Sequence, residues 1–198
     1  EAITIGIRVG FAYLTLGSVA SPLEGFVEVK IGKTSTNEEY FDVYYSGPVR
    51  SAGGTAAAVS VVLIDYIRKK FGYAAYDPTE KEVLRMVTEV NDYHERITNL
   101  QYKPSEEELK FLLKRLPVQV NGDPSEKIEV SNHKDLKRIA TNRVRNGPCL
   151  VIAESLAQKA PKVWARLSKW AKEFDLENWA FLEEFVKVQK KMKSGGGE

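Results

Sequence analysis

The stretch that decides the fold is Tyr40–Gly72, with the sequence YFDVYYSGPVRSAGGTAAAVSVVLIDYIRKKFG. Its first residues, Tyr40–Tyr45, are rich in aromatic side chains and predict a β-strand, which the following Gly47-Pro48 pair ends. From Ala56 onward apolar residues recur at helical spacing, and Gly72 follows as a stop signal. The stretch therefore predicts a strand and a helix joined by a glycine-rich loop.

The loop between them contains Arg50, Gly53, Gly54 and Thr55. Glycines ahead of a helix let backbone N–H groups turn toward an anion, and the helix dipole adds positive charge there. Arg50 could clamp a phosphate beside them. The loop lacks both the Gly-Lys-Ser/Thr of a P-loop and the glycine spacing of a dinucleotide fingerprint. Two interpretations stay open: a phosphate site, or glycines that only permit close packing against the strand.

Toward the N-terminus, residues 24–31 alternate apolar and polar side chains and predict a strand antiparallel to Tyr40–Tyr45. Residues 1–21 fit both a strand and a helix, and we favour a helix that ends near Gly17. Helix and strand signals also recur through the second half of the chain. They predict helices from Thr79 to about Asn99, from Ser105 to Leu116, from Pro148 to Pro161, from Pro161 onward and from Asp175 to about Lys193, and a strand Val118–Asn121 paired with Lys127–Val130.

This pattern predicts a helix-rich α+β fold, with about seven helices and four to five short strands in small antiparallel sheets. A chain of 198 residues fits one domain, residues 1–193, with a possible sub-boundary near residue 122. The last residues, 194–198, resemble a flexible linker. There is no initiator Met, and both ends look cut from a longer protein.

Composition narrows the class of protein. The net charge of +2 does not by itself indicate a nucleic-acid binder, so any basic surface must come from local clustering. The single cysteine, Cys149, excludes an internal disulfide, fits a reducing cytoplasm and is expected to be a small buried hydrophobe. No apolar run is long enough to span a membrane, and the N-terminus shows no signal peptide.

The sequence predicts no catalytic residues, no metal ligands and no cofactor in this chain. Its two histidines, His94 and His133, have no flanking ligand pattern, and one cysteine does not complete a zinc site. There is neither a Gly-x-Ser-x-Gly motif for a nucleophile nor an Asp-x-Asp motif for metal-dependent phosphoryl transfer.

A dense group of cations follows the predicted hairpin in the second half of the chain. Cations along one surface can follow a DNA backbone, whereas most charge runs are solvated faces or pair with internal acids. Both interpretations stay open. The candidate phosphate contacts are Lys134, Lys137, Arg138, Arg143 and Arg145, together with Arg50 and the Gly53–Thr55 loop.

Two apolar groups have a binding interpretation beside the commoner one of core packing. Rings on one face of a strand can stack on bases, and the candidates are Tyr40, Phe41, Tyr44 and Tyr45. An apolar stripe on the last helix can dock another chain, and its residues are Trp179, Leu182, Phe185 and Val186.

The chain also resembles a known family. The quoted stretch from Ser46 is similar to a segment of the large subunit of archaeal family-D DNA polymerase, and further runs follow in the same order over most of the chain. They are Asn99–Tyr102, Leu116–Val118, Gly122–Glu126, Ala140–Gly147 and Ala157–Trp164. One departure is Asn146, where the family pattern implies a second glycine.

The resemblance implies a part of a polymerase that adds deoxynucleotides to a primer-template with Mg²⁺, and whose small subunit holds an exonuclease. It places the catalytic aspartates in double-psi β-barrels outside this chain, and cysteine-rich zinc modules elsewhere. The chain is then expected to be an N-terminal domain for assembly, dimerisation and DNA binding in replication. Its partners are expected to be DNA, the small subunit or a second large subunit. The alternatives are a scaffold without DNA contact and, more remotely, a nucleotide-binding enzyme using the Gly53-Gly54 loop.

Overall fold

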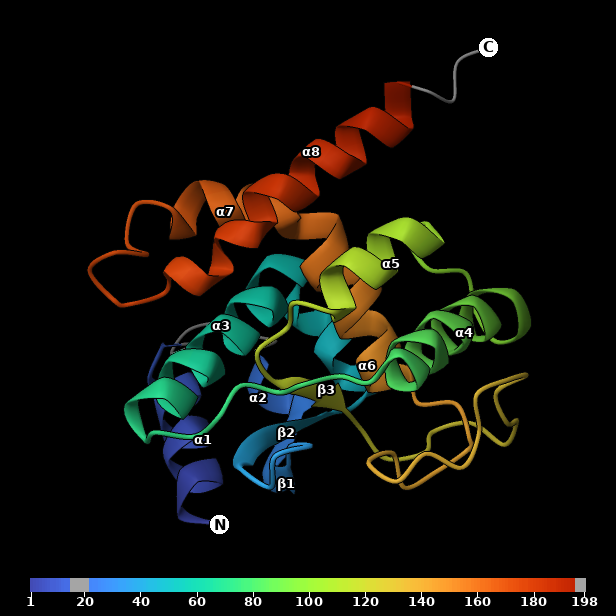
Figure 1. Cartoon of the computed structure of the whole chain (residues 1–198), viewed down its shortest axis with the longest axis horizontal. Helices are drawn as coiled ribbons and strands as arrows, with labels where there is room; N and C mark the ends of the chain where they lie inside the picture. The colour runs from blue at the N-terminus through green and yellow to red at the C-terminus, as the bar shows by residue number, and fades with distance from the viewer. Residues whose placement is uncertain (15–21, 195–198) are drawn as a thin grey trace.

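A computed structural model describes residues 1–14 and 22–194 (Figure 1). Its strands are β1 (Phe26–Lys33), β2 (Glu39–Tyr45) and β3 (Gln119–Asn121). Its helices are α1 (Ala2–Leu14), α2 (Pro22–Gly25), α3 (Gly54–Lys70), α4 (Glu80–Arg96), α5 (Glu106–Leu113), α6 (Asn146–Leu150), the π-helix η2 (Val151–Ala157), α7 (Gln158–Leu167), α8 (Phe181–Ser194) and the short 3₁₀ helices η1 (Gly47–Ala52) and η3 (Glu177–Ala180). The helix-rich α+β class is confirmed.

The strands form one mixed sheet in the order β1-β2-β3. β1 and β2 pair antiparallel as predicted, whereas β3 runs parallel to β2, with Val43 opposite Val120. The predicted pairing of Val118–Asn121 with Lys127–Val130 is wrong, because Glu129 instead makes an isolated bridge to Arg143. Every residue of β2 after Glu39 is buried. A strand buried in this way needs a partner on both edges, and β3 supplies the second one.

The predicted organising helix is present, although α3 starts at Gly54, two residues before Ala56. It packs against η2 and α7. The capping boxes that start α4 and α5 are also confirmed, since Thr79 and Ser105 accept hydrogen bonds from Glu82 N and Glu108 N. Both helices end a few residues before the predicted positions.

The helix predicted from Pro148 to Pro161 differs in the structure, because it starts at Asn146 and Pro161 lies inside α7 without ending a helix. Proline has no N–H, so it leaves a carbonyl in the preceding turn without its helical partner. In this fold Gln189 Nε2 of α8 donates to the carbonyl of Ala157 at 3.0 Å. The segments α6, η2 and α7 follow one another without a break. A tertiary contact thus compensates for the proline.

The two ends of the chain are partly described. α1 confirms the helix predicted near the N-terminus, while its predicted end near Gly17 lies outside the described residues. Asp175 does not cap the last helix; it has a φ of 54° and precedes η3 and α8. Of the predicted flexible tail, only Ser194 is described.

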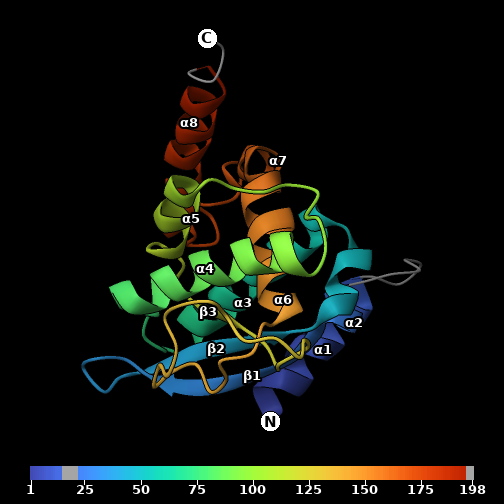
Figure 2. The ribbon, with the colours of Figure 1, turned by 90° about the vertical axis from the view of Figure 1, so that its right-hand side faces the viewer.

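One hydrophobic cluster collects buried side chains from α1 to α8. The possible sub-boundary near residue 122 stays a prediction. The irregular segment between β3 and α6 lies beneath α4 and in front of the sheet (Figure 2). Within residues 1–14 and 22–194, no helix is both long and apolar enough to cross a membrane.

Candidate nucleic-acid interface

The glycine-rich loop opens α3 without a side-chain cap. Gly53, the N-cap residue, has a φ of 81°, a conformation that favours glycine, and it has no side chain to accept a hydrogen bond from the first turn of the helix. A Cβ on Gly54 would lie 2.4 Å from the carbonyl oxygen of Glu154. The packing interpretation therefore holds for Gly54, although its neighbour is η2 and not the strand.

Arg50 is held at the edge of this loop by Glu154. Its Nη2 lies 2.9 Å from Glu154 Oε1, and its side chain is 36% exposed whereas that of Glu154 is 7% exposed. The same carboxylate oxygen accepts a hydrogen bond from Gln101 N at 2.8 Å. Arg50 thus keeps solvent contact but shares its charge with a buried acid.

A groove of about 660 Å³ lies between the loop and the helix formed by η2 and α7. Its lining includes Gly53, Gly54 and three cations of α7 that the sequence reasoning missed: Lys159, Lys162 and Arg166. Within the described part of the chain, none of these three cations forms an ion pair. Positions i, i+3 and i+7 lie on one side of a helix, so their spacing was the signal that could have identified them.

The groove therefore holds four cations and one carboxylate, with the N-terminus of α3 at its wall. Unpaired helix N–H groups and cationic side chains both favour a bound anion. Arg50, Gly53, Gly54 and Thr55 of the predicted site all line this groove.

The predicted cation cluster of residues 134–145 is not one surface. Arg145 is 1% exposed and pairs with Glu89 of α4, with Nη2 2.6 Å from Oε2. Burial opposes the charged form of Arg145, but the Glu89 carboxylate outweighs it and raises the pKa of the guanidinium. Arg145 also donates to Asn121 Oδ1 at 2.5 Å. The prediction that Arg145 contacts a phosphate is wrong, because the side chain is buried and neutralised.

Arg138 is also committed to acids of the protein. It donates to Asp77 Oδ1 at 2.5 Å and to Glu82 Oε2 at 2.6 Å, and its side chain is 15% exposed. Lys134 pairs with Glu129 at 2.6 Å while remaining exposed. Lys137 and Arg143 lie at the surface, and phosphate contact through them stays a prediction.

The two apolar binding candidates are core residues. All four candidate rings on β2 are buried: Tyr40, Phe41, Tyr44 and Tyr45. The predicted stacking platform is therefore wrong. On the last helical segment, Trp179, Leu182 and Phe185 are fully buried and only Val186 stays partly exposed. Trp179 Nε1 donates to Asp65 Oδ2 of α3 at 2.8 Å, so this stripe holds the C-terminal helix on its own domain.

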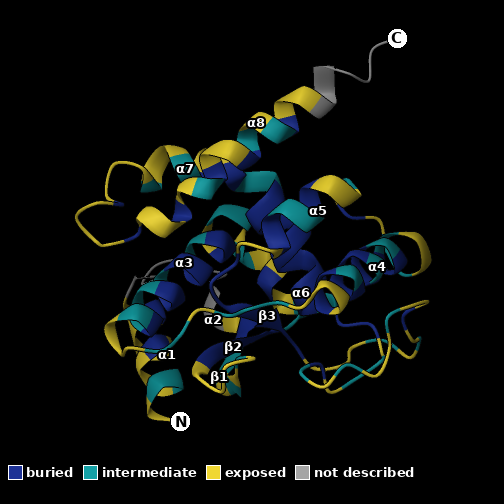
Figure 3. Cartoon of the chain, in the orientation of Figure 1, coloured by how far each residue is buried: buried dark blue, intermediate teal, exposed yellow. Residues whose placement is uncertain are grey.

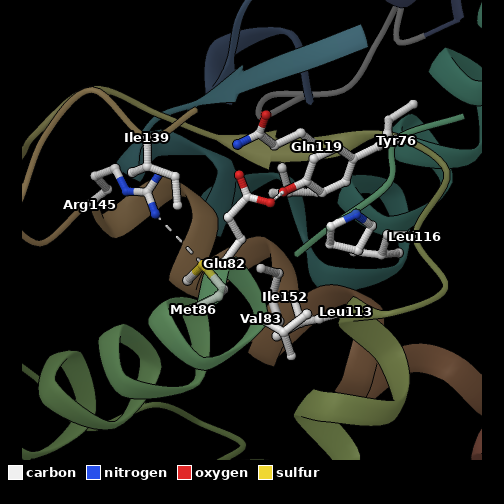
Figure 4. Close-up of a pocket in the computed structure, with 13 residues that line it drawn as sticks. Tyr76, Glu82, Val83, Met86, Leu113, Leu116, Gln119, Ile139, Arg145 and Ile152 are labelled. Carbon is white, nitrogen blue, oxygen red and sulfur yellow. Dashed lines mark hydrogen bonds between the residues drawn. The ribbon is translucent and has the colours of Figure 1, made fainter. Parts of the chain in front are cut away.

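Cys149 is buried, as expected, and burial raises the pKa of its thiol. A small cavity lies between α4, α5 and the sheet (Figure 4). Its volume of about 30 Å³ suits a single water molecule and no organic ligand. Tyr76, Glu82, Met86 and Arg145 are among its lining residues. In the described ranges, no three His, Cys, Asp or Glu side chains are grouped closely enough to hold a metal ion.

Comparison with known proteins shows the family. The family model for "DNA polymerase II large subunit DP2, N-terminal" matches residues 1–188. The DNA polymerase II large subunit of Nanoarchaeum equitans is 50% identical over 203 residues, which cover all of this chain and 16% of that protein. The subunits of Methanothermobacter thermautotrophicus and Methanosarcina barkeri are 47% and 44% identical over 97% and 100% of this chain.

The chain spans 16–17% of the length of these three relatives. The matched family model is that of the N-terminal part, in agreement with the resemblance in the sequence. The chain therefore belongs to the family of the N-terminal region of the DNA polymerase II large subunit, the archaeal family-D polymerase.

Proposed function

We propose that this chain is a non-catalytic domain of a replicative DNA polymerase, and that it holds the DNA backbone in the groove between the Gly53-Gly54 loop and α7. The polymerase reaction, with its Mg²⁺, then takes place in the rest of the large subunit, and the exonuclease belongs to the small subunit. The names of the relatives support the setting, since each is a DNA polymerase large subunit.

The observation that carries the proposal is the side of α7 that faces the loop. Lys162 and Arg166 are exposed, and no acid of the described residues pairs with either. A lysine or arginine without an internal partner can displace the counterions of a phosphate, which makes binding depend on salt. Arg50 and the uncapped start of α3 contribute further positive potential across the groove.

The experiment measures DNA binding by fluorescence anisotropy at several salt concentrations, for the chain and for the double variant Lys162→Ala/Arg166→Ala. Loss of two phosphate contacts should reduce the slope of log K against log[salt] by about 1.4 on single strands, and weaken binding roughly tenfold at low salt. The matched control is Lys81→Ala/Lys127→Ala, which removes two exposed cations without ion pairs elsewhere in the described structure. The control should keep the wild-type slope.

Two results would contradict the proposal. One is the absence of salt-dependent DNA binding by the unmodified chain. The other is an equal loss in the two double variants, since that result would assign the effect to net charge alone. A thermal shift with dNTP but not with DNA would instead favour the nucleotide-binding alternative.

A second candidate function is assembly, and one observation favours it. α1 exposes Ile5, Val9 and Tyr13 at 54%, 64% and 76%, four residues apart on one side of the helix. Exposed apolar stripes of this kind mark docking surfaces. We propose that the remainder of the large subunit covers this stripe, because most of the length of the relatives lies outside the matched region.

The interface predicted from the sequence lay on the stripe of α8, which is largely buried in the fold. The interface proposed here lies on α1 instead. Changing Ile5 and Val9 to Lys in a full-length large subunit should make the N-terminal region more sensitive to limited proteolysis without changing the DNA affinity of the isolated chain. Light scattering of the isolated chain is the companion measurement. A dimer that these changes dissociate would show that a second copy, and not the rest of the subunit, covers the stripe.

A further inference from the structure

A second, apolar cleft adjoins the basic groove. It has a volume of about 370 Å³ and lies between α3, α7 and the loop that follows α7. Two large aromatic residues of that loop line it and are exposed, Trp170 at 54% and Phe174 at 41%. Figure 3 shows that most of this loop is at the surface. Large exposed rings in a domain with a well-packed core call for a binding partner.

The cleft and the groove are neighbours on the surface. Val59 of α3 and Arg166 of α7 line both of them. A polymer whose charged backbone follows the groove past Lys162 and Arg166 therefore comes close to the rings of the loop that directly follows α7.

The rings are arranged as an open surface and not as a closed core contact. The centroids of Trp170 and Phe174 are 6.4 Å apart with 52° between their planes, so they do not stack on each other. Phe174 is edge-on to Tyr66 at 6.1 Å, which holds it on α3. The faces left open can accept a flat π-system, and any nucleobase presents one.

The charge around the cleft favours a polyanion. Arg166, Lys169 and Lys172 are exposed and have no ion pair among the described residues, and Lys70 lies over the ring of Tyr66 at 5.2 Å. Of the nearby acids, Asp175 is paired with Lys69 at 3.0 Å, while Glu173 and Glu177 are exposed. Aromatic faces beside a track of cations are the combination that binds single-stranded nucleic acid.

We propose that this surface binds single-stranded DNA, with the backbone on Lys162 and Arg166 and unpaired bases stacked on Trp170 and Phe174. This inference rests on the proposed function, and it specifies that the bound DNA is single-stranded. A duplex keeps its bases stacked on one another, so only an unpaired strand can offer its base faces to the two rings. The strand next to a primer terminus is the segment of a replication substrate that meets this requirement.

The test compares three ligands and four forms of the chain. The ligands are oligothymidylate of about 16 nucleotides, the upper end of the usual site size, an abasic strand of equal length and a duplex. The forms are wild type, Trp170→Ala/Phe174→Ala, Trp170→Phe, and Phe71→Ala as the matched control, because Phe71 is 64% exposed and does not line the cleft. Melting temperatures verify that each variant is folded, and Trp170→Ala alone replaces the double variant if that one is not.

The double variant should bind oligothymidylate roughly 5- to 150-fold more weakly for each base that loses its ring, with an unchanged salt slope, since stacking involves no counterion release. Trp170→Phe should retain most of the affinity, and Phe71→Ala all of it. The abasic strand should bind wild type and double variant equally.

The inference fails if the double variant binds oligothymidylate as wild type does, or if wild type binds the abasic strand or the duplex as tightly as oligothymidylate. In either case the salt-dependent loss in Lys162→Ala/Arg166→Ala still tests the backbone groove independently. If the double variant keeps its DNA affinity but loses association with the remainder of the large subunit added in trans, the cleft is a protein-docking surface and the inference is overturned.

Discussion

The segment of residues 134–145 and helix α7 both carry closely spaced cations, but the fold places them in opposite environments. In the first region, Arg145 lies in the core on Glu89, and Arg138 is clamped by Asp77 and Glu82. In the second, Lys162 and Arg166 face an open groove, and no acid of the described residues pairs with them. The denser cluster in sequence is thus the poorer candidate for a DNA surface.

The comparison shows that the location of the acids decides what a cation does. α4 presents Glu82, Glu89 and Asp92 to the irregular segment, and each of the three takes part in holding it. A buried arginine paired in this way fixes the position of a segment that has little regular secondary structure. The one acid that lines the groove among the described residues, Glu154, pairs with Arg50, so Lys162 and Arg166 of α7 are available to a ligand.

The largest effect expected from this comparison concerns Arg145. Changing Arg145 to Ala leaves the buried Glu89 with Arg85 as its one ion-pair partner among the described residues, and should lower the free energy of unfolding by about 3–5 kcal/mol. Urea denaturation followed by circular dichroism measures this change. The exposed Arg143→Ala is the control and should stay within about 0.5 kcal/mol of wild type. A stable Arg145→Ala protein would show that the two regions do not differ as described.

The next effect concerns Asp42, which lies on the same buried network through Asn121. Burial raises the pKa of the Asp42 carboxyl to about 7, although the hydrogen bond from Asn121 and the charges of Arg145 and Lys30 act against this. The folded state then binds a proton more tightly than the unfolded state, whose pKa is about 3.9. This contribution to stability is therefore lost as pH rises from about 4 to about 7, and is constant above that range.

Changing Asp42 to Asn removes this titration. As pH rises from 4 to 8, wild type should lose up to about 4 kcal/mol of stability relative to the variant. Denaturation at a series of pH values measures it, and the exposed Asp123→Asn serves as the control. An unchanged difference across the series would mean that the carboxylate is stabilised in the network and not strained by burial.

The smallest effect compares the surfaces directly. The triple variant Lys134→Ala/Lys137→Ala/Arg143→Ala should weaken DNA binding by only about threefold, which is less than the loss in the double variant on α7. The reason is that Lys134 already forms an ion pair with Glu129. Anisotropy titrations at the same salt concentrations measure both. A larger loss in the triple variant would restore the irregular segment as the main DNA surface.

The amount that was predictable differs between the two regions. The helices α3, α4 and α5 follow from local signals, since the glycines, the two capping boxes and the apolar spacing all act within a few residues. The parallel pairing of β3 with β2 and the continuity of helix through Pro161 depend on partners far along the chain. Local patterns contain no information on such partners.

The same distinction applies to the candidate site. Arg50 and the Gly53–Thr55 loop were identified because glycines before a helix are a local signal, and all of them line the groove. Lys159, Lys162 and Arg166 were visible only as a helical spacing, in a stretch where Pro161 argued against a continuous helix. Arg145 was assigned to the surface because nothing near it in the sequence shows that Glu89 lies against it.

By itself, the sequence determined the family, the helix-rich class, the glycine-opened helix and the absence of a disulfide. Only the tertiary structure decided which cations are neutralised, which aromatic rings are buried and which remain open beside the groove. The physical reason is that charge and apolar surface act through space. Their effect depends on which acids and rings the fold brings within a few ångströms, and for Arg145 and Glu89 those partners are separated by 56 positions in the chain.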